Sequence, residues 1–112
     1  MKDDSVFIRH MLVEVDYILF SIKDKDFNSL MSDETHKRAV IRSLEIIGEA
    51  AKKISHEFKE KYPQVEWKGM AGLRDKLIHF YFGVDWDIVW DIIDKEIPLL
   101  KKQLDVIISE IG

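Results

Sequence analysis

The most regular feature of the sequence is a run of apolar side chains that recur at heptad spacing between residues 40 and 58. A straight helix brings such positions onto one face, so the run predicts a long helix that packs against a core. Polar residues follow the same spacing two positions earlier, which is a rotation of about 200°. The opposite face of this helix is therefore expected to meet solvent. The apolar positions are Val40, Leu44, Ile47, Ala51, Ile54 and Phe58, and the polar ones are Arg38, Arg42, Glu45, Glu49, Lys52 and His56.

A third face of the same segment favours the close approach of another helix. It carries Ala39, Ser43, Ile46 and Ala50, and Gly48 lies in the middle of the expected helix. A glycine there costs about 1 kcal/mol relative to alanine. It is tolerated more readily where a neighbour packs tightly, so we expect tight packing at Gly48.

The rest of the chain also has helical periodicity. Asp4 or Ser5 can cap a first helix that ends near Lys23, and Ser32 or Asp33 can cap the long second helix. The residues from 24 to 31 have no period and contain turn formers, so they are read as a connection. The apolar stripe expected to face the core from the first helix is Ile8, Leu12, Val15, Leu19 and Ile22.

Two prolines divide the second half of the chain. Pro63 ends the second helix, because proline disfavours helical dihedrals in the residue before it and has no backbone N–H. A third helix is expected over residues 68–82 and is terminated by Gly83. A final helix follows Asp85, with a kink or two abutting helices at Pro98. The sequence therefore predicts an all-α, up-and-down bundle of four to five helices in one domain over residues 1–112.

Composition limits the classes of function that this chain can have. There is no cysteine, which excludes disulfides and thiolate metal sites, and the histidines outside the third helix have no ligand spacing, so neither a metal nor another cofactor is expected. The sequence shows neither a membrane-spanning run nor a signal peptide, and a cytoplasmic location is the default expectation. A net charge of -4 argues against general coating of nucleic acid. An RNA substrate would need a local basic cleft.

The segment from Arg74 to Tyr81 carries the residues best suited to chemistry. Arginine presents a planar fork of donors that matches phosphate oxygens, and histidine exchanges protons near neutral pH. Arg74 and His79 together suit phosphodiester cleavage in RNA, where a 2'-hydroxyl loses a proton while negative charge grows on the phosphate. On a regular helix these two side chains point about 140° apart. Both can reach one phosphate if the helix distorts, if the side chains converge, or if two chains share the site, and the geometry favours a dimer cleft.

These residues resemble the HEPN superfamily, and more closely its HepT-like toxin branch. The resemblance rests on Arg-x4-His-x-Tyr, here Arg74, His79 and Tyr81, and spans about residues 36–100. It is supported by residues 44–51, by Tyr62-Pro63 and Trp67 before the motif, and by Val84-Asp85 and Trp90 after it.

The resemblance implies a metal-independent endoribonuclease toxin whose homodimer cleft is built from both copies of the motif. Arg74 would bind and stabilise the phosphate, His79 would be the general base or acid, and Asp75 would orient the site. Tyr81 would be adenylylated by a cognate minimal nucleotidyltransferase antitoxin, which would neutralise the toxin. The added phosphate would block an RNA cleft by volume and by like charge.

Simpler explanations exist for each of these residues. Arg74 could be a surface arginine paired with Asp75 or Glu66, and His79 and Tyr81 could be ordinary core residues. A second function is a noncatalytic dimer that binds a nucleotide or the nucleotidyltransferase. Glu45 and Glu49 are read as partners of Arg38 and Arg42 on a solvated face, although a place in the site is an alternative. Trp67, Trp86 and Trp90 are read as core or dimer anchors, with Trp67 also a candidate for stacking on a base.

Overall fold

A computed structural model describes residues 2–77 and 83–112, with side chains from residue 4 onward. In these ranges the fold is all-α, as predicted, and no helix there is long and apolar enough to cross a membrane. The helices are α1 (Lys2–Ser21), α2 (Phe27–Met31), α3 (Glu34–Lys53), α4 (His56–Lys61), α5 (Trp67–Ala71), α6 (Leu73–Leu77), α7 (Trp86–Asp91), the π-helical turn η1 (Ile92–Glu96) and α8 (Ile97–Ile111).

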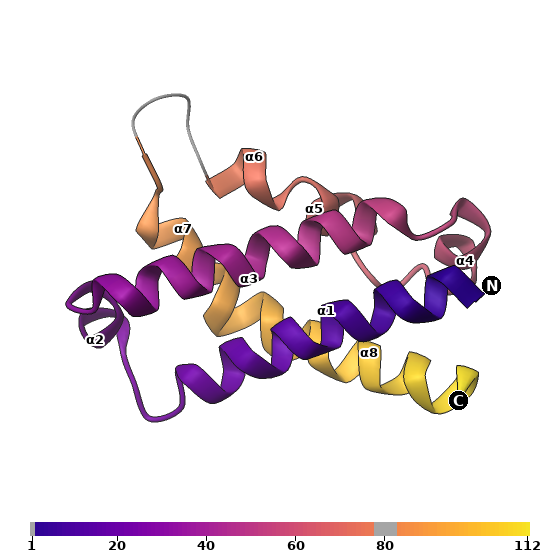
Figure 1. Ribbon diagram of the computed structural model, residues 1–112, viewed down its shortest axis with the longest axis horizontal. Coiled ribbons are helices and arrows are strands. Elements are labelled where there is room, and N and C mark those ends of the chain that lie inside the picture. The colour runs from indigo at the N-terminus through magenta and orange to yellow at the C-terminus, as the bar shows by residue number, and fades with distance from the viewer. Residues whose placement is uncertain (1, 78–82) are drawn as a thin grey trace.

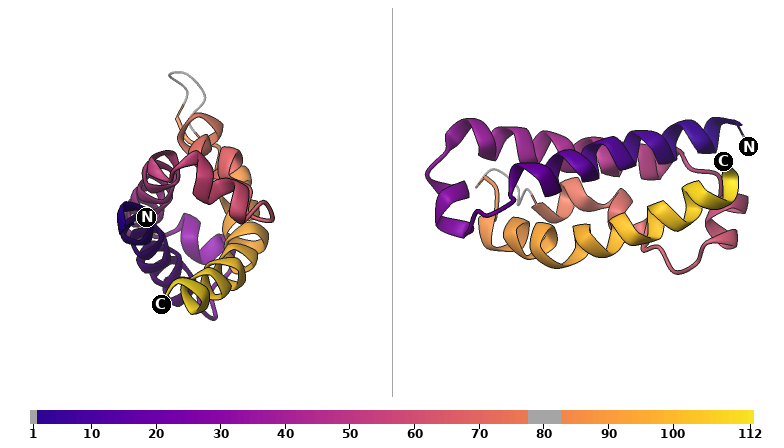
Figure 2. Two further views of the ribbon diagram at one scale, coloured as in Figure 1. Left: turned by 90° about the vertical axis from the view of Figure 1, so that its right-hand side faces the viewer. Right: turned by 90° about the horizontal axis from the view of Figure 1, so that it is seen from below.

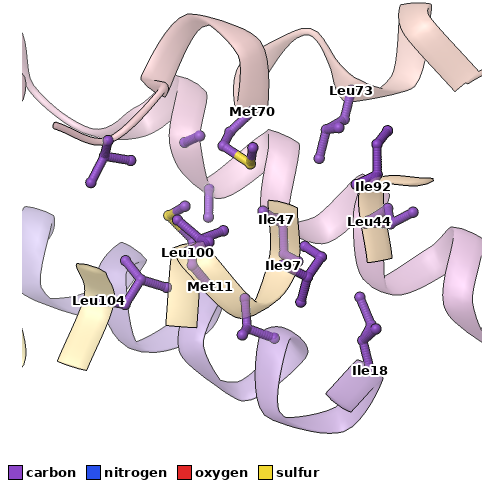
Figure 3. Close-up of a cluster of buried hydrophobic side chains, with 14 of the residues drawn as sticks. Met11, Ile18, Leu44, Ile47, Met70, Leu73, Ile92, Ile97, Leu100 and Leu104 are labelled. Carbon is purple, nitrogen blue, oxygen red and sulfur yellow. The ribbon is translucent and has the colours of Figure 1, made fainter. Parts of the chain in front are cut away.

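Three long helices make the frame of the bundle. Helix α1 packs against both α3 and α8, and the short α5 and α6 follow α3 on the side away from α1 (Figure 1). The long helices surround a common interior when the molecule is seen end-on (Figure 2). Apolar side chains from α1, α3, α5 and α8 meet there (Figure 3). Burial of these side chains supplies the main favourable term in folding.

The apolar face of α1 is wider than the predicted stripe. Ile8 and Val15 are fully buried as expected, but so are Met11 and Ile18, while Leu12, Leu19 and Ile22 are only half-buried. All five predicted stripe residues therefore lie in the core or against it, and the prediction missed the second row formed by Met11 and Ile18. The reason is that α1 lies between two neighbours, α3 and α8, and buries the face directed between them.

The first helix begins earlier, and the second helix ends earlier, than the sequence suggested. Asp4 is not an N-cap, because it lies inside α1 and is buried. Its carboxylate accepts hydrogen bonds of 2.7 Å from both the N–H and the Oγ of Ser55. Ser55 in turn caps α4 by accepting from the N–H of Phe58. The helix predicted to run through Phe58 therefore ends at Lys53, and a new helix begins at His56.

The region between α1 and α3 contains a helix that the sequence did not predict. Residues 27–31 form α2, and the Asp26 carboxylate caps it by accepting from the N–H and the Oγ of Ser29. Asp33 caps α3 by accepting from the N–H of His36, which confirms one of the two predicted caps. Hydrogen bonds of Asp26, Ser29 and Asp33 thus set where α2 and α3 begin.

Gly48 is a point of close packing, as predicted. A Cβ atom at this position would lie 3.0 Å from the carbonyl oxygen of Met70 and 3.8 Å from the Cβ of Leu73. The absent side chain lets α3 approach the backbone where α5 passes into α6. The helix expected over residues 68–82 is divided there at Gly72, and the stretch beyond Leu77 that the prediction included lies outside the described residues.

The C-terminal region confirms the predicted cap of the last helix. Asp85 caps α7 by accepting from the N–H of Ile88. Gly83 has a positive φ of 88°, and the helix end predicted just before it lies outside the described residues. The expected disturbance at Pro98 is the π-helical turn η1, which joins α7 to α8. A proline has no N–H for an α-helical bond and its ring crowds the carbonyl four residues earlier, so a wider turn accommodates it.

His36 is a buried imidazole at the corner between α1 and α3. The hydroxyl of Ser21 donates to the carbonyl of Ile18, so it accepts from Nε2 of His36 at 2.9 Å. Nδ1 is buried and has no hydrogen-bond partner among the described residues. Burial lowers the pKa of His36 below 6.5, the positive charge of Lys25 lowers it further, and Asp33 partly opposes the shift.

We predict that Gly48→Ala destabilises the protein by about 1–3 kcal/mol, because the new Cβ meets a backbone carbonyl that cannot move independently. Gly69→Ala is the matched control, since its Cβ would meet only an ordinary contact at 3.7 Å. That variant should be neutral or up to about 1 kcal/mol more stable. Urea unfolding measures both, and equal stability of the two variants would contradict the packing at Gly48.

We predict that the stability contributed by neutral His36 is complete above pH 6.5 and is lost as the pH falls below this value. The unfolded chain binds a proton near pH 6.5, whereas the folded chain resists protonation until a lower pH. Urea unfolding of the wild type and His36→Gln between pH 7.5 and 5 tests this. The wild type should lose more stability than the variant, and parallel losses would refute the assignment.

Candidate active site

The residues on either side of the segment that contains His79 and Tyr81 lie next to each other on the bundle. Helix α6 carries Arg74 and Asp75 and ends at Leu77. The backbone N–H of Asp85 donates to the carbonyl of Leu77 at 3.1 Å. His79 and Tyr81 themselves lie outside the described residues, so the structure places two of the four predicted site residues and fixes the two ends of the segment that holds the others.

Helix α3 runs alongside both of these ends. On the α6 side, Nε of Arg74 lies 3.8 Å from Oε2 of Glu45. On the α7 side, Nζ of Lys37 lies 5.0 Å from the centre of the Trp86 ring. Lys37 and Glu45 are eight residues apart, which is about 12 Å along a helix. The stretch of α3 between them therefore lies beside the candidate site (Figure 1).

The Arg74 guanidinium is accessible and only loosely paired. Its side chain is 67% exposed, and the distance to Glu45 is too long for a hydrogen bond. The partners proposed from the sequence, Asp75 and Glu66, are not the residue that the structure places against it. Asp75 is exposed on α6. Arg74 thus keeps its donors available for an anion that approaches from solvent.

For Glu45, the ion-pair partner predicted from the sequence was wrong. Glu45 was assigned to Arg38 or Arg42, but it pairs across the bundle with Arg74, and Glu49 pairs with Lys52 at 3.5 Å. The alternating charges of the polar stripe offered several helical partners of suitable spacing. The signal that could have identified Glu45 is its position one turn before Gly48, where the prediction already brought another helix close.

An acidic groove lies on the other side of α6. It has a volume of about 450 Å³ and includes the side chains of Asp85, Asp87, Asp91 and Glu96. Lys76 also lines it, with Nζ 4.0 Å from Oε2 of Glu96. The two sides of α6 therefore differ in charge.

The tryptophans near the motif are structural in the described part of the chain. Trp67 is 6% exposed and its Nε1 donates to the carbonyl of Tyr62 at 2.9 Å, which leaves no open ring face for a base. Trp90 is half-buried and meets the Phe27 ring edge-on. The suggestion that Trp67 stacks on RNA is wrong, and its assignment to the core is confirmed.

Potential metal ligands do not gather in the described ranges. No group of three or more histidine or carboxylate side chains there is placed to hold a metal ion.

Comparison with known proteins identifies the family. A family model described as "Ribonuclease HepT-like" matches residues 8–107. This chain belongs to that family of ribonucleases, so the resemblance noted in the sequence is confirmed.

Two relatives show how far the similarity extends. A protein of Caldanaerobacter subterraneus subsp. tengcongensis named "Putative RNase" is 46% identical over 110 residues, which are 98% of each chain. A protein of Thermococcus cleftensis named "Probable ribonuclease HepT" is 47% identical over 79 residues, covering 70% of this chain and 72% of the relative. No solved structure matches the chain.

We predict that Arg74→Ala changes the free energy of unfolding by no more than about 0.5 kcal/mol, because an exposed ion pair at this distance contributes little. Its neighbour Leu73 is 1% exposed and gives the contrasting control. Leu73→Ala should cost about 2–5 kcal/mol. Thermal and urea unfolding measure both variants, and a large loss for Arg74→Ala would show that the arginine is structural.

Proposed function

We propose that this chain is a metal-independent endoribonuclease toxin that uses Arg74 and His79 on the same phosphodiester. The observation that carries the proposal is the motif Arg74-x4-His79-x-Tyr81, which falls within the matched region of a ribonuclease family. The exposure of Arg74 supports it, since a phosphate can reach the guanidinium without unfolding any helix.

The chemistry needs one proton acceptor and one fixed positive charge. His79 removes the proton from the 2'-hydroxyl, whose oxygen attacks the adjacent phosphorus. The bond to the 5'-oxygen then breaks as that oxygen takes a proton from water, which leaves a 2',3'-cyclic phosphate and a 5'-hydroxyl. Arg74 stabilises the negative charge that grows on the phosphate oxygens. Asp75 orients the site from the surface of α6.

The proposed active unit is a cytoplasmic homodimer with motif residues from both copies in one cleft. This arrangement rests on the 140° that separates the positions of Arg74 and His79 on a regular helix. A cognate minimal nucleotidyltransferase would neutralise the toxin by adding adenylate to Tyr81. The new phosphate would then occupy the cleft and repel RNA.

We predict that the wild type cleaves RNA in excess EDTA and that His79→Ala lowers the rate by at least about a hundredfold, the usual contribution of a positioned acid or base. Intact mass must show that Tyr81 is unmodified, and light scattering must show a dimer. Circular dichroism of His79→Ala provides the folding control.

The same experiment separates the two functions. Cleavage that persists in His79→Ala would refute the role of this histidine. If a demonstrably unmodified wild-type dimer leaves RNA intact, the chain is instead a noncatalytic partner of the nucleotidyltransferase.

A further inference from the structure

Two arginines occupy the part of α3 that lies beside the candidate site. Arg38 and Arg42 are exposed and fall between Lys37, which contacts Trp86, and Glu45, which contacts Arg74. Arg42 is one turn and Arg38 two turns from Glu45, or about 4.5 and 10.5 Å along the helix. A second and a third guanidinium therefore follow Arg74 along the surface of the bundle.

Neither arginine is paired with the acidic residues of its own polar stripe. Glu45 lies 3.8 Å from Arg74, and Glu49 lies 3.5 Å from Lys52. In the described ranges no carboxylate oxygen lies within 4.0 Å of a side-chain nitrogen of Arg38 or Arg42. Both guanidinium groups are free to bind an anion.

A groove between α1 and α3 extends this basic surface. Its volume is about 320 Å³, and Arg42 lines it together with His10, Lys53 and Phe7. Glu49 is the carboxylate among its lining residues, and Lys52 lies beside that carboxylate. The path from Arg74 across Arg42 thus opens into a groove in which cations outnumber acids.

The opposite side of α6 would repel nucleic acid. There the groove formed with α7 and η1 presents four carboxylates, which outnumber the two cations Lys76 and Lys95 that pair with Glu96 and Asp91. The other two carboxylates are those of Asp85 and Asp87. A polyanion that approaches Arg74 from this side meets like charge, whereas one that approaches over α3 meets arginines.

We propose that the RNA strand reaches the active site across α3, with Arg38 and Arg42 each binding a backbone phosphate. This inference rests on the proposed ribonuclease function and assigns the direction from which its substrate enters. The two arginines lie along the path and not at the reacting phosphate, so they contribute to RNA affinity and leave the chemical step unchanged. Phosphate contacts of this kind bind without reading sequence.

The test measures binding and cleavage separately. A fluorescent single-stranded RNA is titrated with the His79→Ala protein, and with the same protein carrying Arg38→Gln, Arg42→Gln or both, over a series of salt concentrations. Arg9→Gln is the matched control, because Arg9 is exposed on α1 and does not line the groove. Steady-state cleavage is measured for the same arginine variants with His79 intact.

The double variant should bind more weakly, and its dependence of log Kd on log salt should lose about 1.4 units of slope, about 0.7 for each phosphate contact on a single strand. In cleavage, KM should rise while kcat stays constant, and Arg9→Gln should behave as the parent protein. If the double variant keeps the slope and the KM of the control while the wild type cleaves RNA, the path is wrong and the proposed function stands. An arginine-dependent slope without cleavage refutes the nuclease and leaves Arg38 and Arg42 as an RNA-binding surface only. Absence of both RNA binding and cleavage refutes both proposals.

Discussion

The position of the candidate site depends on the contact between Gly48 and the backbone of α5. A Cβ there would lie 3.0 Å from the Met70 carbonyl, so only glycine lets the two segments approach this closely. Helix α6 begins immediately after this contact, at Leu73, and the next residue is Arg74. Glu45 precedes Gly48 by one turn of α3 and thereby meets the guanidinium. A single close contact between helices thus places the motif arginine against the polar face of α3.

The sequence predicted the features that depend on neighbouring residues. The apolar stripe of α3 and the caps Asp33 and Asp85 follow from spacing and short-range hydrogen bonds. The end of α3 at Lys53 could not be predicted in this way. It depends on the hydrogen bond that Asp4 accepts from Ser55, and these two residues are 51 positions apart in the sequence. Helix α2 was missed because five residues are too few to show a period.

The predictions about the candidate site also succeeded where they depend on neighbouring residues and failed where they depend on distant ones. The motif could be recognised from residue types and spacing, whereas the partner of Arg74 could not, since Glu45 and Glu49 had several cations at suitable helical distances. The net charge of -4 also does not determine where the acidic side chains lie on the surface. The fold gathers four of them on the α7 and η1 side of α6, and leaves Arg38 and Arg42 on the other side. An acidic chain can therefore offer RNA a basic surface.

The loose pair between Arg74 and Glu45 is well suited to an exchange of partners. Breaking a buried ion pair costs about 3–5 kcal/mol, and an arginine held in that way would resist capture by a substrate. An exposed pair is worth at most about 1 kcal/mol and is screened by salt. A phosphate offers the guanidinium two parallel hydrogen bonds in place of a contact at 3.8 Å. In the proposed reaction, Glu45 can therefore yield Arg74 to the RNA at little cost.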